Sequence, residues 1–450
     1  MEEIRDNYLI EGSLLKGLLL IAAPIIATNL LQSIMEVVDL FFVGRLGAEA
    51  IAGVAVSLTL IMVLMTVIIG INTATTALVS RHFGAGEPVE AGKVLTNAIL
   101  LGIVFAVVIS VIGIIFSDDL LMALGAEEIV VGYGADYINI LFAGLAVLVT
   151  MWIAMTFFQG CGDSRTPMYV VIFTNGINIV TDPLLIFGMY GFPELGVAGA
   201  SLATVSSRFI GMLVIIYLLL RRYPEMDFSS HLRGDLHTAK QLITIGVPAM
   251  IQTGMRSITF LAIMAIVAMF GTAALSAYGI VNRLEIVFLM PGFGIAMGTA
   301  VIVGQNLGAG RPDRAEKGVL YSLLAYGVFM AAVSAVLIIF GSSIMGFFDP
   351  SGTSTPIGIS YFATVCPFYL LLAVSVILSF AMNGAGDTKT PMYAVLVSMV
   401  MVQIPLAYLL SAVAGMGITG IWTGMVIGLF VMTAMLSYSF MYGGWREVKI

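Results

Sequence analysis

Two polar stripes inside otherwise apolar segments hold the residues best suited to chemistry. Each stripe has three polar side chains separated by three and four residues: Gln32, Glu36 and Asp39 in the first, and Asn175, Asn178 and Asp182 in the second. Such spacings place side chains on one face of a helix. Ionisable groups inside a membrane span cost about 2.5–3.5 kcal/mol each, and they usually face the interior of a bundle. We therefore predict that both stripes serve function.

Asp182 is followed directly by Pro183, and this pairing indicates an ion site. Proline removes one backbone hydrogen bond and favours a kink, which leaves the carbonyl of Ile179 free near the carboxylate. Broken helices of this kind coordinate coupling ions in transporters. The neighbourhood offers carboxylate, amide and hydroxyl oxygens, which suit Na⁺, whereas a buried aspartate can also carry a proton. Asp39 and Asp182 lie about five and six residues from the outer ends of their segments. At about 1.5 Å per residue, both carboxylates are therefore predicted to lie at a similar depth in the membrane.

The elements that hold these stripes are transmembrane helices. The composition is 60% hydrophobic and 10% charged over 450 residues, with a mean hydropathy of +1.07, far from soluble usage. A span needs about 20 apolar residues, and about twelve segments qualify. Their predicted ranges are 14–44, 51–79, 94–116, 128–158, 167–188, 195–220, 241–270, 275–304, 318–342, 357–383, 391–413 and 418–441. The predicted fold class is an all-α integral membrane protein.

The distribution of charges predicts the topology. With a cytoplasmic N-terminus, fifteen basic residues fall on the inside and only Arg45 falls outside, which fits an even number of spans and two cytoplasmic termini. The start of the chain, "MEEIRDNYLIEGS", has no basic n-region and no cleavage site, so we expect the first span to remain as an anchor. Cys161 and Cys366 are far apart and are predicted to be free thiols.

The chain repeats itself at a constant offset of 224 residues. "GDSRTPMY" at 162–169 recurs as "GDTKTPMY" at 386–393, and "FGAGEPVEAGK" at 83–93 recurs as "LGAGRPDRAEK" at 307–317. Parallel repeats of this kind surround a central site in transporters. We predict two six-helix bundles related by a pseudo-twofold axis along the membrane normal. The predicted parts are an N-terminal segment (1–13), an N-lobe (14–220), a linker (221–240), a C-lobe (241–441) and a C-terminal segment (442–450).

The order of these landmarks resembles the multidrug and toxic compound extrusion (MATE) family over essentially the whole chain, and the "GAG", "GDSRTP" and "NIVTDP" motifs carry the likeness. The resemblance implies a prokaryotic member of the branch with acids in the N-lobe. It implies an antiporter in the cell membrane that acts as a monomer, exporting organic, often cationic, compounds in exchange for Na⁺ or H⁺. No cofactor is implied.

The resemblance also implies the members of the ion site. The motifs "EVVD", "NIVTDP" and "GASLAT" place Asp39, Asn178, Asp182 and Thr204 at the ion, and "ADYINILFAG" places Tyr137 beside it as a hydrogen-bonding partner. Glu36 departs from the family pattern, in which a neutral polar residue is expected. The extra carboxylate is predicted either to bind cationic substrates or to change the number of coupling ions.

The C-terminal copy of the repeat provides an internal control. At the positions of Asp39 and Glu36 it carries Ile263 and Phe260, so the fold does not require the acids. Five further charged residues within the spans are expected to be mainly paired inside the bundles: Asp136, Arg208, Arg256, Arg283 and Glu285. Arg256 matches Gln32 in the repeat and is the best functional candidate of these. The predicted substrate contacts are Gln32, Glu36, Asn175 and Arg256.

Several other classes of protein are disfavoured. The glycine turns lack the Lys-Ser/Thr ending of a P-loop, which argues against an ATP pump. The three histidines fall in loops, and no catalytic triad is apparent, so an intramembrane enzyme is the weakest alternative. The basic residues are explained by topology without nucleic acid. A flippase for lipid-linked oligosaccharide is the nearest rival, and a passive channel would not need acids in one lobe only.

Overall fold

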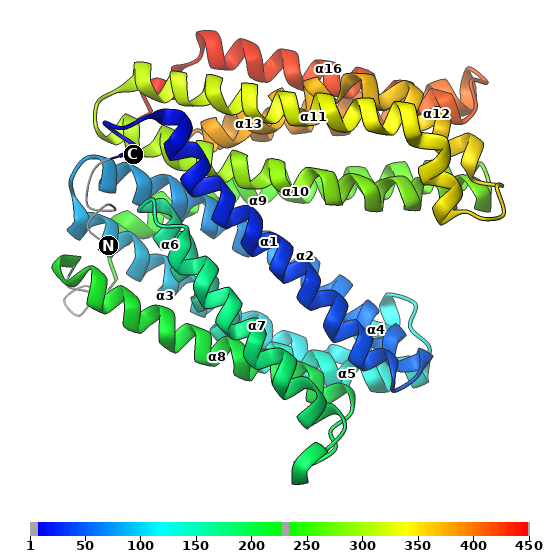
Figure 1. The fold of residues 1–450 in the computed structure, drawn as a ribbon, viewed down its shortest axis with the longest axis horizontal. Coiled ribbons are helices and arrows are strands. Elements are labelled where there is room, and N and C mark those ends of the chain that lie inside the picture. The colour runs from blue at the N-terminus through cyan, green and yellow to red at the C-terminus, as the bar shows by residue number, and fades with distance from the viewer. Residues whose placement is uncertain (1–7, 227–233, 449–450) are drawn as a thin grey trace. The chain divides into compact units, whose positions relative to one another are not determined.

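The computed structural model describes residues 8–226 and 234–448. The remaining parts of the predicted N-terminal segment, linker and C-terminal segment (1–7, 227–233 and 449–450) lie outside the described residues. Within the described residues the chain is all-helical, as the composition predicts (Figure 1).

Sixteen α-helices are present in the described residues. In the first half they are α1 (Leu14–Gly44), α2 (Ala48–Gly84), α3 (Pro88–Ile115), α4 (Ser117–Ala123), α5 (Glu128–Ala143), α6 (Leu145–Gly160), α7 (Arg165–Ile186) and α8 (Val197–Arg222). In the second half they are α9 (Leu236–Ala268), α10 (Thr272–Gly308), α11 (Pro312–Phe348), α12 (Thr355–Val365), α13 (Tyr369–Ala385), α14 (Lys389–Val395), α15 (Ile404–Tyr408) and α16 (Ile418–Tyr442). Wide π-helical turns, Leu396–Gln403 and Leu409–Val413, continue α14 and α15.

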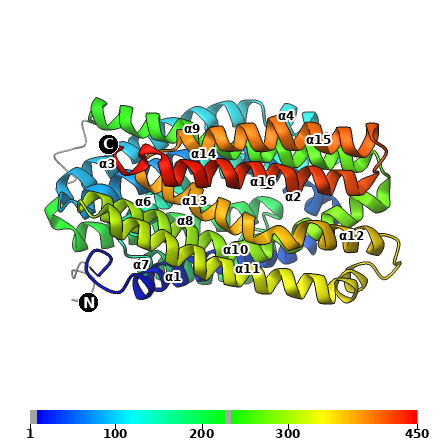
Figure 2. The same ribbon diagram turned by 90° about the horizontal axis from the view of Figure 1, so that it is seen from above.

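The helices form two compact units. The N-unit comprises the described residues of Ala23–Gly246, and the C-unit comprises those of Arg5–Ala22 and Val247–Ile450. In the N-unit α7 packs along α8, and in the C-unit α13 packs against α10, α11 and α16, which run beside it in Figure 2. The boundaries fall inside α1 and α9, just before Pro24 and Pro248. The first part of α1 therefore belongs to the C-unit, and the first part of α9 belongs to the N-unit. The predicted lobes, in contrast, are continuous ranges of the sequence.

The backbone repeats along with the sequence. Helix α10 begins and ends 224 positions after α2, and α11, α13 and α14 begin 224 positions after α3, α6 and α7. Gly86 and Gly310, in the paired turns, have φ angles of 76° and 69°, a region that favours glycine. The predicted tight turns are therefore built alike in both halves.

Eleven helical segments of the described residues are long and apolar enough to cross a membrane, and α5 with α6 makes a twelfth if it counts as one span. The prediction of about twelve spans is thereby confirmed. The predicted segment 128–158 is not straight, because α5 and α6 meet at an angle of 54° at Gly144. A Cβ atom at Gly144 would lie 2.5 Å from both γ-carbons of Val205 on α8, so the bend coincides with close helix packing.

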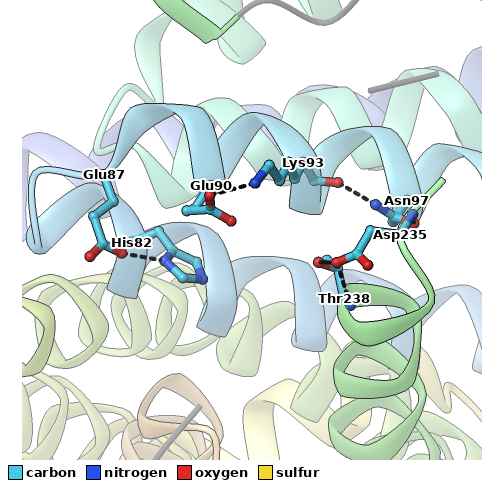
Figure 3. A network of polar contacts seen from close by, with 7 residues as sticks. All are labelled: His82, Glu87, Glu90, Lys93, Asn97, Asp235 and Thr238. Atoms are coloured by element: carbon cyan, nitrogen blue, oxygen red, sulfur yellow. Dashed lines mark hydrogen bonds and ion pairs between the residues drawn. The ribbon is translucent and has the colours of Figure 1, made fainter. Parts of the chain in front are cut away.

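A network of polar contacts fixes the start of α9 in the N-unit (Figure 3). The Asp235 backbone N–H donates to Asn97 Oδ1 on α3 over 2.8 Å, and the Asn97 amide donates to the Lys93 carbonyl over 2.8 Å. The hydroxyl and backbone N–H of Thr238 donate to Asp235 Oδ2 and hold the pKa of Asp235 below its ordinary value. Asp235 therefore stays ionised at neutral pH. Its contribution to the free energy of unfolding is lost only as the pH falls through this lowered pKa.

We expect Asn97→Ala to lower the free energy of unfolding by about 1 kcal/mol, because the buried asparagine supplies both an acceptor and a donor. Glu90→Gln is the matched control. It removes a partly exposed ion pair with Lys93, which is worth at most about 0.5 kcal/mol. Thermal unfolding of the full chain in detergent, followed by tryptophan fluorescence, measures both changes. Equal effects of the two substitutions on the free energy of unfolding would contradict the role given to Asn97 in fixing the start of α9.

Both cysteines are free, as predicted, and the structure shows that both are buried. Cys161 lies between α6 and α7 and hydrogen-bonds with Tyr223, and burial raises the pKa of its thiol well above the ordinary value. Because the thiolate is the reactive form, we expect Cys161 to resist iodoacetamide at pH 7–8 in the folded protein and to react after unfolding. Peptide mapping by mass spectrometry measures the labelling, and complete labelling of folded protein would contradict this expectation.

Candidate functional site

Helix α7 contributes a buried polar stripe to the N-unit. Asn175, Asn178 and Asp182 are 7%, 1% and 0% exposed. The Asn178 amide donates to Asp182 Oδ1 over 2.9 Å, which holds the carboxyl group in place. The Asn175 amide donates to the carbonyl of Leu31 over 3.0 Å and links α7 to α1. The spacing of these residues on one helical face produces the stripe that the sequence predicts.

Helix α1 brings the second carboxyl group to the first. Asp39 is partly buried, and its side chain lies within electrostatic range of Asp182. Asp39 Oδ1 and Asp182 Oδ2 are both buried, and neither has a hydrogen-bond partner among the described residues. Two ionised carboxyl groups close to each other repel unless a proton or a cation lies between them. The arrangement can therefore hold one of these.

Tyr137 and Arg208 complete the surroundings of the pair. Tyr137, on α5, is 5% exposed and lies within electrostatic range of Asp39, Asp182 and Glu36. Its ring packs with residues of α1, α2, α7 and α8 in one apolar cluster. Arg208, on α8, lies within electrostatic range of Asp39 and Glu36, and it donates to Thr174 Oγ1 over 3.2 Å.

Arg208 was not among the predicted site residues, although it stands one helical turn after Thr204. That spacing was the available signal, since residues four apart share a helix face. Thr204 is partly buried on α8, and its carbonyl accepts a hydrogen bond from Ser207 over 2.9 Å. The role of Thr204 at the ion stays a prediction.

The other predicted residues have different surroundings. Gln32 is partly buried on α1, and Glu36, one turn before Asp39, is exposed. Arg256 is on α9 in the C-unit, and its buried Nε has no hydrogen-bond partner among the described residues. Helix α7 continues through Pro183 to Ile186, and the Pro183 carbonyl accepts a hydrogen bond from Phe187. A kink at Pro183 stays a prediction.

The chemistry of the pair favours a small cation or a proton. The described residues contain no group of three or more His, Cys, Asp or Glu side chains that could hold a metal ion. The pair instead offers carboxyl oxygens, with an amide beside them. Oxygens of this type suit hard cations.

Comparison with known sequences finds relatives of this chain over nearly its whole length. The sequence profile described as MatE matches residues 24–184 and 248–409, one match in each half of the chain. Among curated proteins, the chain is 30% identical to the probable multidrug resistance protein YoeA of Bacillus subtilis, covering 97% of this chain and 96% of that protein. It is 26% identical to the probable multidrug resistance protein NorM of Thermotoga maritima, covering 96% and 93%. It is 28% identical to an FAD transporter of Shewanella oneidensis, covering 84% of each.

Solved structures share the fold. A crystal structure described as MATE in the bent conformation superposes with a TM-score of 0.90 at 22% identity, covering 99% of this chain and 98% of that one. A transporter of the MOP superfamily from Pyrococcus furiosus, described as having a binding pocket of reverse polarity, gives a TM-score of 0.87 at 21% identity over 98% of each chain. These likenesses confirm an all-helical membrane fold over nearly the entire length.

Proposed function

We propose, from the premise that this chain belongs to the MatE family of multidrug transporters, that it is an antiporter coupled to a cation. It exports organic, often cationic, compounds in exchange for inward Na⁺ or H⁺. The observation that carries this proposal is that two carboxyl groups lie within electrostatic range of each other, each with a buried oxygen that has no hydrogen-bond partner among the described residues. Such a pair favours a transporter over a passive channel, because binding and release of an ion at the pair can drive a transport cycle.

The proposed ion site consists of Asp39, Asn178, Asp182 and Thr204, with Tyr137 beside it. The interaction of Asp39 with Asp182, and the bond from the Asn178 amide, support this set. These acids stand in the first half of the chain alone, which supports membership of the branch with acids in the N-lobe.

The proposed cycle alternates between inward and outward openings of two lobes, with limits at 14–220 and 241–441. Ion binding at the pair reshapes the N-lobe and weakens substrate binding, so that the substrate is released outside. Substrate contacts are assigned to Gln32, Glu36, Asn175 and Arg256. The protein acts as a monomer in the cell membrane with both termini in the cytoplasm, an orientation that the distribution of Lys and Arg supports.

The test is uphill efflux of a fluorescent organic cation from proteoliposomes without ATP, under separately imposed Na⁺ and pH gradients. Efflux driven by either gradient identifies the coupling ion and excludes a passive channel. Absence of a response to both gradients, in protein shown to be folded and oriented, would contradict antiport and favour a lipid-linked oligosaccharide flippase.

A further inference from the structure

A positive charge on α8, Arg208, stands close to the carboxyl groups of the N-unit, within a segment long and apolar enough to cross a membrane. Its guanidinium lies within electrostatic range of Asp39 and Glu36 on α1. None of the ion pairs in the part of the chain that the structure describes includes Arg208. The arginine therefore acts on the two carboxyl groups through space, without contacting them.

A neutral side chain on α7 holds the guanidinium in this place. Arg208 Nη1 donates a hydrogen bond to Thr174 Oγ1 over 3.2 Å, and Thr174 is fully buried. The two helices approach closely here, because a Cβ atom at Gly211 would lie 2.3 Å from Thr174 Cγ2. Thr174 stands one helical turn before Asn178, whose amide donates to Asp182. The hydrogen bond therefore fixes the positive charge beside the polar stripe of the ion site.

The second half of the chain shows that the repeated fold does not require these charges. The four ionisable residues of the N-unit cluster, Glu36, Asp39, Asp182 and Arg208, correspond at the offset of 224 residues to the apolar residues Phe260, Ile263, Leu406 and Met432. Met432, in the place of the arginine, is 3% exposed on α16. The arginine is thus present in the half that has the carboxyl groups and absent from the half that lacks them.

The sum of the charges links Arg208 to Glu36. When all groups are ionised, Glu36 adds one negative charge to those of Asp39 and Asp182, and Arg208 adds one positive charge. The four groups together therefore carry the same net charge as the two aspartates alone. Because like charges repel and opposite charges attract, a positive charge near the aspartates weakens binding of a cation there, and a negative charge strengthens it.

We propose that Arg208 is an internal cation that lowers the affinity of the Asp39 and Asp182 pair for the coupling ion, and that Glu36 offsets part of this effect. Arg208 sets the affinity without contacting the ion. A moderate affinity suits a transport cycle, because an ion that binds too tightly is released slowly. This inference rests on the proposed function, since it assigns control of ion binding to residues that surround the proposed ion site.

The test is uphill efflux of ethidium from proteoliposomes, measured against the concentration of the driving ion, Na⁺ or H⁺, that the wild type uses. The result to compare is the ion concentration that gives half the maximal rate. Ethidium is kept saturating, so that a change in substrate affinity does not contribute. Arg208→Met is expected to lower the half-saturating concentration at least about fivefold. It should also lower the maximal rate, because the ion is released more slowly.

Three further variants separate charge from packing. Glu36→Gln should raise the half-saturating concentration, by a smaller factor because Glu36 is exposed and its charge is screened. The double variant Glu36→Gln and Arg208→Met should lie between the two single variants. Arg208→Lys keeps the positive charge and should stay within about twofold of the wild type. Arg221→Met, which removes an exposed arginine from the end of the same helix, is the matched control and should change nothing.

Two results would overturn the role given to Arg208. The first is an unchanged half-saturating concentration in Arg208→Met, and the second is an equal fall in Arg208→Lys, which would assign the effect to packing. If Arg208→Met does not fold, Glu36→Gln decides, and a half-saturating concentration that stays the same or falls would contradict the proposal. Failure of the proposed function is distinguishable, because the wild type itself would then show no efflux under either gradient.

Discussion

The double substitution Asp39→Asn and Asp182→Asn lowers ion-driven export at least about fivefold while the protein stays folded. Asparagine keeps the size of the side chain, but it cannot carry a proton or balance a cation between the two helices. Coupling between two binding sites typically amounts to about 1–3 kcal/mol, or about 5–150-fold in affinity. We therefore expect uphill transport in proteoliposomes to fall by a factor within that range or to vanish.

Downhill exchange of substrate separates loss of coupling from loss of the transporter. The double variant should still equilibrate a labelled organic cation across the membrane, because the side chains assigned to substrate contact are left unchanged. Asp119→Asn, which removes an exposed carboxylate of α4 in the N-unit, is the control and should transport normally. Uphill export by the double variant at the wild-type rate would refute the role given to the two aspartates.

The substitution Gly199→Ala destabilises the N-unit and impairs transport. A Cβ atom at Gly199 on α8 would lie 2.4 Å from the carbonyl oxygen of Leu185 and 2.8 Å from the backbone N of Ile186, both on α7. Backbone atoms cannot rotate away, so the two helices must separate close to Asp182. Overpacking of this type costs about 1–3 kcal/mol.

Gly176→Ala, on the same helix α7 as the ion site, is the matched control, because a Cβ atom there meets open space. It should be neutral, or stabilising by at most about 1 kcal/mol, since alanine favours helix more than glycine does. Thermal unfolding and uphill efflux are measured for both variants. If Gly199→Ala is as stable and as active as Gly176→Ala, the close packing of α7 on α8 is not required.

The sequence predicts those parts of the fold that depend on local pattern. Apolar runs give the long helices, although α2 extends beyond the predicted 51–79 to Ala48–Gly84. The polar stripes predict which side chains share a helix face, because residues three and four apart lie on the same side of a helix. The repeat offset predicts the paired turns.

Local sequence patterns do not predict features that depend on contacts between residues far apart in the chain. The bend at Gly144 coincides with packing against Val205 on another helix, and no proline marks it in the sequence. Glu285 accepts hydrogen bonds from the hydroxyls of Tyr361 and Tyr369, which are 76 and 84 residues away along the chain. Hydrophobicity likewise gives no sign that the first part of α1 belongs to the C-unit, because an apolar segment does not specify its partner.

The most direct test of the account is whether binding of an organic cation expels the coupling ion from purified protein. Adding ethidium to the wild type in weakly buffered detergent solution should release protons, or should displace bound ²²Na⁺, in proportion to the site occupied. The variant with both Asp39→Asn and Asp182→Asn should bind ethidium and release neither ion. Equal release from this variant would contradict the claim that these two carboxyl groups couple the ion to export.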